Sequence, residues 1–137
     1  MTTERRVEVR DLVKVRVVEA RPGRSLVSGQ AILTLKFEPH DSIVVNGEEV
    51  ACLYASVTNE ETDRSWGWRQ AQVRYALGLD PVYQCSRTLQ VPAFSPSELQ
   101  SILGWDLVVA VDTQETSEYG VRLRVLDFYL WDKRPGE

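Results

Sequence analysis

Alternating valines near the start of the chain constrain its fold more than any other feature. Every odd position from Val7 to Val17 is valine except Asp11, while most even positions are polar. Side chains of a β-strand point to opposite faces with a period of two, so this pattern predicts a strand with one buried face. A half-buried strand needs further strands to pair with and a core to cover its apolar side.

Two further segments extend this pattern. After the turn-forming stretch RPGRS, odd positions are again apolar over residues 31–37, which predicts a second strand antiparallel to the first. Asn46-Gly47 stands between apolar runs. It predicts a two-residue hairpin turn, because these residues tolerate the positive φ angles that such a turn needs.

Four later segments are also predicted to be strands, at residues 71–77, 82–91, 105–111 and 121–131. One helix is predicted over residues 96–103. Ser95 can cap it, Pro96 suits its first position, and Glu98 stands three residues after the cap, as a capping box requires.

About eight short strands and one short helix predict an all-β fold, a single antiparallel β-sandwich over residues 1–137, with a small β-barrel as the alternative. We expect residues 1–6 and 133–137 to be flexible termini. No apolar run approaches the ~18 residues of a bilayer-spanning helix, and the first ten residues lack the apolar core of a signal peptide. We therefore expect a soluble, cytoplasmic protein without a membrane partner.

The charged and reactive residues favour no catalytic or metal site. His40 is the only histidine and lies in a turn beside Pro39, where no triad partner is visible. Cys52 and Cys85 lack the spacing of a zinc site or a disulfide framework, so we expect two buried free thiols. We predict no metal and no cofactor. Carboxylates from separate strands can converge unseen in a linear sequence, so an enzyme with such a site stays a third alternative.

Segments around Cys52, Trp68 and Cys85 resemble the core of immunoglobulin variable domains, where a tryptophan packs between two cysteines. In that family several strands intervene between the tryptophan and the second cysteine. Here sixteen residues separate Trp68 from Cys85, so we assign no family.

The stretch DRSWGWRQ carries two of the four tryptophans of the chain. In a strand Trp66 and Trp68 would share a face, yet the following residues are apolar at odd positions, which implies a bulge or loop end near Gln70. We expect Trp68 to pack in the core and Trp66 to lie on the surface. Tryptophan and arginine dominate binding hot spots, so the candidate binding residues are Trp66, Trp68, Arg64 and Arg69.

The leading hypothesis is a non-catalytic module that recognises a protein partner. The alternative is binding of single-stranded nucleic acid or glycan through exposed aromatic and arginine side chains. A net charge of −4 disfavours a chain whose main work is neutralising phosphates, although thirteen of the sixteen basic residues are arginine. A homo-oligomer is also compatible with the sequence.

Overall fold

The computed structural model describes residues 11–45, 47–63, 66–79, 90–116 and 120–131. The termini expected to be flexible, residues 1–6 and 133–137, lie outside these ranges. The strands are β1 (Asp11–Arg24), β2 (Ala31–Pro39), β3 (Val44–Val45), β4 (Glu48–Glu49), β5 (Leu53–Thr58), β6 (Thr62–Asp63), β7 (Gln90–Val91), β8 (Asp106–Thr116) and β9 (Gly120–Leu130), and the helices are α1 (Trp68–Ala76) and α2 (Pro96–Ser101).

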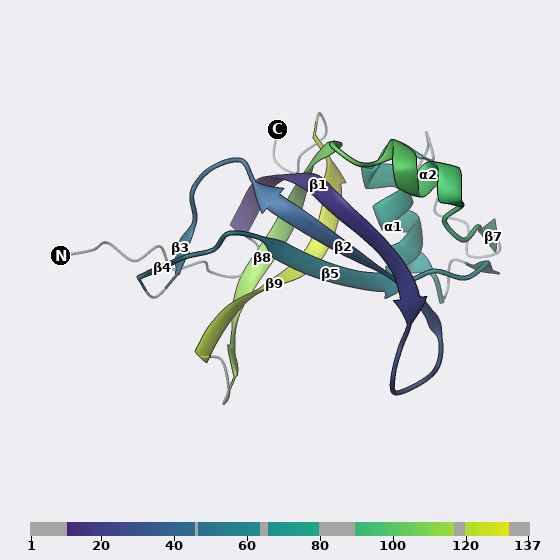
Figure 1. The fold of residues 1–137 in the computed structure, drawn as a ribbon, viewed down its shortest axis with the longest axis horizontal. Coiled ribbons are helices and arrows are strands. Elements are labelled where there is room, and N and C mark those ends of the chain that lie inside the picture. Colours follow the sequence, from purple (N-terminus) through teal and green to yellow (C-terminus); the bar gives the residue numbers. More distant parts are fainter. Residues whose placement is uncertain (1–10, 46, 64–65, 80–89, 117–119, 132–137) are drawn as a thin grey trace.

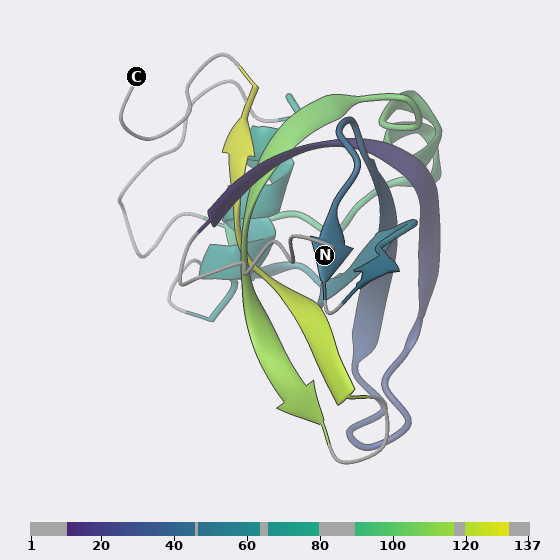
Figure 2. The same ribbon diagram turned by 90° about the vertical axis from the view of Figure 1, so that its left-hand side faces the viewer.

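Five strands form one curled antiparallel sheet in the order β5-β2-β1-β8-β9 (Figure 1). The sheet is organised about β1, which pairs with β8 along residues 11–16 and with β2 along residues 15–24. The register against β2 shifts between Val17 and Glu19, so Val18 is the extra residue of a β-bulge. Bulges bend a strand and increase its twist, and Figure 2 shows the sheet arching into a half-barrel.

The connections make a Greek key. In the main sheet β1, β2 and β5 follow one another as a meander, and the chain then runs through α1 and α2 before β8 returns beside β1. The resulting order β8-β1-β2-β5 is the spatial order of a Greek key. The two edge strands, β5 and β9, also contact each other, so the sheet is a partly open barrel.

The core lies on the inner face of the arch, and α1 contributes to it from the side of β9. The alternating valines behave as predicted within the described part of β1, because Val13, Val15 and Val17 are all buried. The largest fully buried apolar side chains in the described part of the chain are Phe37, Phe128, Leu33, Leu35, Ile43, Leu77, Ile102 and Leu107.

The predicted strand over residues 71–77 is wrong, because this segment forms most of α1 and the turn after it. The buried positions of α1 and the turn after it include Gln70, Val73, Arg74 and Leu77, spaced by three and four residues as on one face of a helix. Gln70 and Arg74 are polar, so the buried face of this helix does not show up in the sequence as an apolar stripe. The bulge implied near Gln70 is therefore wrong as well.

The second helix, α2, was predicted correctly, although it ends at Ser101. Ser95 Oγ accepts a hydrogen bond from the backbone N–H of Glu98 at 3.2 Å, and Glu98 Oε1 accepts one from the N–H of Ser95 at 2.9 Å. This reciprocal pair is the predicted capping box, with Pro96 in the first turn.

One predicted turn is confirmed and one is misplaced. Gly47 has φ +78° and joins β3 to β4, as expected of the hairpin, while Asn46 lies outside the described residues. Pro22 and Gly23 lie inside β1, and the turn to β2 follows at residues 25–30. Because β8 pairs only with the first part of β1, the second part is an edge on that side, where proline is tolerated.

The predicted all-β class is confirmed, with α1 as an additional helix. The strands predicted at 105–111 and 121–131 are β8 and β9, which form one long hairpin. Of the strand predicted at 82–91 only β7 lies among the described residues. The five-stranded sheet curls towards a barrel, the form given as the alternative, and α1 covers part of its inner face.

Candidate functional site

Trp66 and Trp68 lie at the start of α1, in a turn that begins at Asp63. The backbone carbonyl of Asp63 accepts a hydrogen bond from Gly67 N–H at 2.8 Å, and Asp63 Oδ1 accepts one from Trp66 N–H at 3.3 Å. Ala71 N–H then donates to the carbonyl of Gly67 at 2.9 Å, which opens the helix. The chain therefore passes from strand β6 to helix α1 within a few residues.

Gly67 is needed in this turn because it lies against Thr62 of β6. A Cβ atom added at Gly67 would stand 2.3 Å from Thr62 Cγ2 and 3.2 Å from the carbonyl oxygen of Asp63. No larger residue fits without a shift. Gly67 itself is buried, while Trp66 and Trp68 on either side of it are exposed.

Trp66 and Trp68, which we call the tryptophan patch, are both exposed. The exposed fraction is 84% for Trp66 and 49% for Trp68. Trp66 lies on the surface as expected, but the expectation that Trp68 packs in the core is wrong. Trp68 is the first residue of α1, and the buried positions of that helix begin at Gln70.

Gln70 fixes the base of the patch. Its side chain is 1% exposed, and Nε2 donates to the carbonyls of Glu60 at 2.9 Å and Pro92 at 2.7 Å. Gln70 Oε1 accepts from the N–H of Glu60 at 3.5 Å. Three backbone groups from two distant segments therefore hold the first turn of α1, so the tryptophan patch stands on a fixed support.

Of the two candidate arginines, Arg64 lies outside the described residues. Arg69 donates from Nη1 to the carbonyl of Leu126 at 2.7 Å and from Nη2 to that of Val125 at 2.9 Å. Its guanidinium also lies 5.3 Å from the ring centre of Phe128. Burial lowers the pKa of Arg69, with Asp127 opposing the shift. Arg69 thus ties α1 to β9.

A second surface, which sequence reasoning missed, covers the outer face of β1, β2 and β5. Here Tyr54 is exposed opposite Lys36 on the neighbouring strand, with Lys36 Nζ 5.9 Å from the centre of its ring. The pKa of Tyr54 is raised, chiefly by a hydrogen bond with Cys52 and against the effect of Lys36. Cys52 is only partly buried, unlike the expectation, and Cys85 lies outside the described residues.

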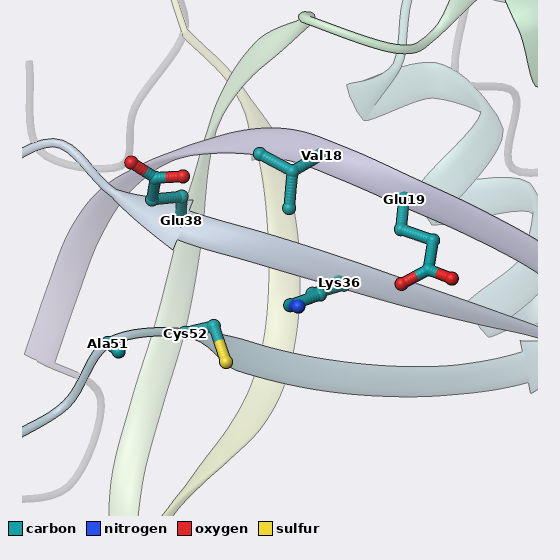
Figure 3. Close-up of a pocket in the computed structure, with 6 residues that line it drawn as sticks. All are labelled: Val18, Glu19, Lys36, Glu38, Ala51 and Cys52. Atoms are coloured by element: carbon teal, nitrogen blue, oxygen red, sulfur yellow. The ribbon is translucent and has the colours of Figure 1, made fainter.

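Beside Tyr54 the outer face holds a hollow of about 390 Å³, drawn in Figure 3. It lies over the bulge of β1 and is lined by Val18, Glu19, Lys36, Glu38, Ala51 and Cys52. The only sequence signal for this surface is the outward phase of the period-two pattern, because the same alternation that buries Leu35 and Phe37 turns Lys36 and Glu38 outward.

His40 belongs to a polar cluster at the other end of β1. Its Nε2 lies 2.8 Å from Asp106 Oδ1, which also accepts from Arg16 Nε at 3.0 Å. The imidazole stands 5.2 Å from the ring of Trp131, and Lys14 Nζ 4.9 Å from that ring. Hydrogen bonds from Arg16 and, to a lesser degree, from His40 lower the pKa of Asp106.

Within the described ranges no three histidine, cysteine or carboxylate side chains gather as they would around a metal ion. None of the described helices is both long and apolar enough to cross a membrane. The chain matches no known protein family, and no curated protein matches its sequence.

Proposed function

We propose that this protein is a non-catalytic interaction module that recognises a protein partner through the tryptophan patch. The observation that carries the proposal is the 84% exposure of Trp66 on a turn held by hydrogen bonds and a buried glutamine. Leaving an indole in water forgoes the gain from burying it, and tryptophan is among the residues that contribute most to protein interfaces.

A fixed support strengthens this interpretation. Binding costs less conformational entropy when the contact residues are already held in place. The turn at Asp63 and the Gln70 contacts supply that order before any partner arrives. We also propose a cytoplasmic location, in keeping with Cys52 as a free thiol.

The test compares affinity with stability in matched variants. The partner is first captured by cross-linking to the wild-type protein, purified, and titrated by calorimetry. Trp66→Ala should lose about 2 kcal/mol or more of binding free energy, roughly a 30-fold loss of affinity, with little change in melting temperature. Tyr54→Ala, which removes an exposed aromatic ring on another surface, should bind normally. Equal affinity of Trp66→Ala and wild type would refute the proposal.

A second candidate function rests on the outer face of β1, β2 and β5. A five-stranded, partly open Greek-key barrel is the architecture of the OB-fold, whose second and third strands bind oligonucleotides or oligosaccharides. The corresponding strands here, β2 and β5, present Tyr54 beside Lys36, with Thr34 and Ser56 paired next to them. An aromatic ring with a nearby cation suits base or sugar stacking.

Two carboxylates near this surface rank nucleic-acid or sugar binding below recognition of a protein partner. Glu19 and Glu38 line the adjacent hollow and would repel phosphates. Fluorescence anisotropy with a labelled oligothymidine of about 15 nucleotides tests the idea. Binding that weakens with salt and is lost in Tyr54→Ala, but not in Trp66→Ala, would favour this function over the first.

A further inference from the structure

The tip of the β1–β2 hairpin presents two aliphatic side chains to solvent. Leu26 and Val27 are 103% and 99% exposed, more than any other large apolar residue in the described part of the chain. They follow Arg24, which is also exposed. Figure 1 shows the β1–β2 hairpin projecting past the end of β5.

Hydrogen bonds from backbone and side-chain groups fix the turn at this tip. Ser25 N–H donates to the carbonyl of Gln30 at 2.9 Å, and Gly29 N–H donates to that of Ser25 at 2.8 Å. Ser25 Oγ accepts from the N–H groups of Val27 and Ser28, both at 3.3 Å. Arg24 Nη1 donates to the carbonyl of Gly29 at 3.0 Å. These hydrogen bonds hold the backbone that carries the two exposed side chains at the end of the hairpin.

The hollow beside Tyr54 complements this tip. Val18 and Ala51 are its apolar side chains, Glu19 and Glu38 bring carboxylates from β1 and β2, and Lys36 lies on β2 with Glu38 (Figure 3). Its volume of about 390 Å³ is several times that of one aliphatic side chain. The protein therefore carries an apolar tip next to an arginine and, elsewhere on its surface, a hollow that combines apolar side chains with charged ones, two of them carboxylates.

We propose that the hairpin tip of one copy of this chain inserts Leu26 and Val27 into the hollow of a second copy, with Arg24 facing Glu38. The tip and most of the hollow lie on the same hairpin, and Val18 precedes Leu26 by eight residues, roughly 26 Å of extended strand. Two hairpins running in opposite directions therefore exchange both contacts about a twofold axis. Such isologous pairing closes at a dimer.

This dimer uses neither residue of the tryptophan patch, so it is independent of the proposed function. Its two contacts are small compared with the interfaces of obligate dimers, so association should depend on concentration. Arg24 of the partner copy offsets the water that Glu38 loses on dimerisation, and Glu19 is already paired with Arg21 of its own strand.

Sedimentation equilibrium over a range of protein concentrations tests the proposal. The wild-type protein should associate reversibly to a dimer and no further. Leu26→Asp should raise the dissociation constant at least ~tenfold. At protein concentrations well below the dissociation constant, the melting temperature of Leu26→Asp should equal that of wild type, because the Leu26 side chain makes no contribution to the core. Leu103→Ser, at a partly exposed leucine outside the hairpin, is the matched control and should dimerise normally.

A charge exchange tests the orientation of the pair. Arg24→Glu and Glu38→Arg should each weaken the dimer, and the double variant should recover most of the lost affinity. A wild-type protein that stays monomeric at high concentration would overturn the proposal. So would larger assemblies, a dimer unaffected by Leu26→Asp, or a double variant no better than the single ones.

Discussion

Arg69 Nη1 lies 2.7 Å from the carbonyl oxygen of Leu126, so a helix side chain occupies the hydrogen-bonding edge of β9. Gln72 adds to this contact, since its Oε1 accepts from the N–H of Phe128 at 3.3 Å. An uncovered edge strand can pair with other chains, and proteins commonly cover such edges. Here α1 covers β9 with side chains, which stabilises the open side of the barrel.

Replacing Arg69 tests this role. Arg69→Ala should lower the free energy of unfolding by about 1.5–3 kcal/mol, because two carbonyls lose a charged donor. Arg69→Lys should recover only part of the lost free energy of unfolding, since one ammonium group does not reproduce the two parallel donors of a guanidinium. Denaturant titration measures both. An Arg69→Ala protein as stable as wild type would mean that the contact is unimportant.

The ion pair between α1 and α2, which is buried on its Arg74 side, should contribute more to stability than an exposed pair. Arg74 is 4% exposed and donates to both oxygens of Glu98, from Nη2 at 2.7 Å and Nη1 at 3.1 Å. Arg74→Ala leaves Glu98, whose side chain is 26% exposed, without its charged donor, at a cost of about 1.5–3 kcal/mol. Arg74→Ala should therefore unfold at much lower denaturant concentration than Arg124→Ala, which breaks the more exposed pair with Asp112. Equal losses would contradict the assignment.

The same pair predicts a pH dependence. The hydrogen bond from Arg74 is the main cause that lowers the pKa of Glu98 in the folded protein. The resulting stabilisation is complete above the unfolded pKa of about 4.3 and disappears as pH falls through the lower folded pKa. Glu98→Gln should therefore be less stable than wild type near neutral pH, and the difference should shrink towards about pH 3. A difference that does not change with pH would rule out this linkage.

A steric prediction concerns the turn below the tryptophan patch. Gly67→Ala brings a methyl group against Thr62 Cγ2 and should destabilise the protein by about 1–3 kcal/mol, as overpacking does. Thr62→Ser removes that methyl group, so the double variant should be more stable than Gly67→Ala alone. Thermal melts of the four proteins measure the coupling. Strictly additive effects would show that the two residues do not meet.

The two tryptophans should contribute little to stability despite their size. Trp66→Ala and Trp68→Ala should each lower the melting temperature far less than Phe128→Ala, which removes a fully buried ring at about 3–5 kcal/mol. Trp68 should cost somewhat more than Trp66, because about half of it is covered. If either tryptophan behaves like Phe128, the patch belongs to the core.

Short-range features of the sequence determined the elements that depend only on neighbouring residues. The valine alternation specifies β1 because strand side chains alternate regardless of what they pack against. The capping box specifies α2 through hydrogen bonds between residues three apart, and Gly47 specifies a hairpin through its own φ angle. The exposure of Trp66 could likewise be expected from the polar residues before it.

The tertiary structure alone decided α1 and the surfaces around it. Gln70 and Arg74 are buried only because Glu60, Pro92 and Glu98, distant in sequence, satisfy their hydrogen bonds. In the sequence alone these partners are not visible, so both polar side chains were expected to face solvent and residues 71–77 were predicted to form a strand. The hollow likewise exists only where the bulge of β1 meets β2 and the residues just before β5, since its lining comes from three separate segments and no local pattern encodes their distance.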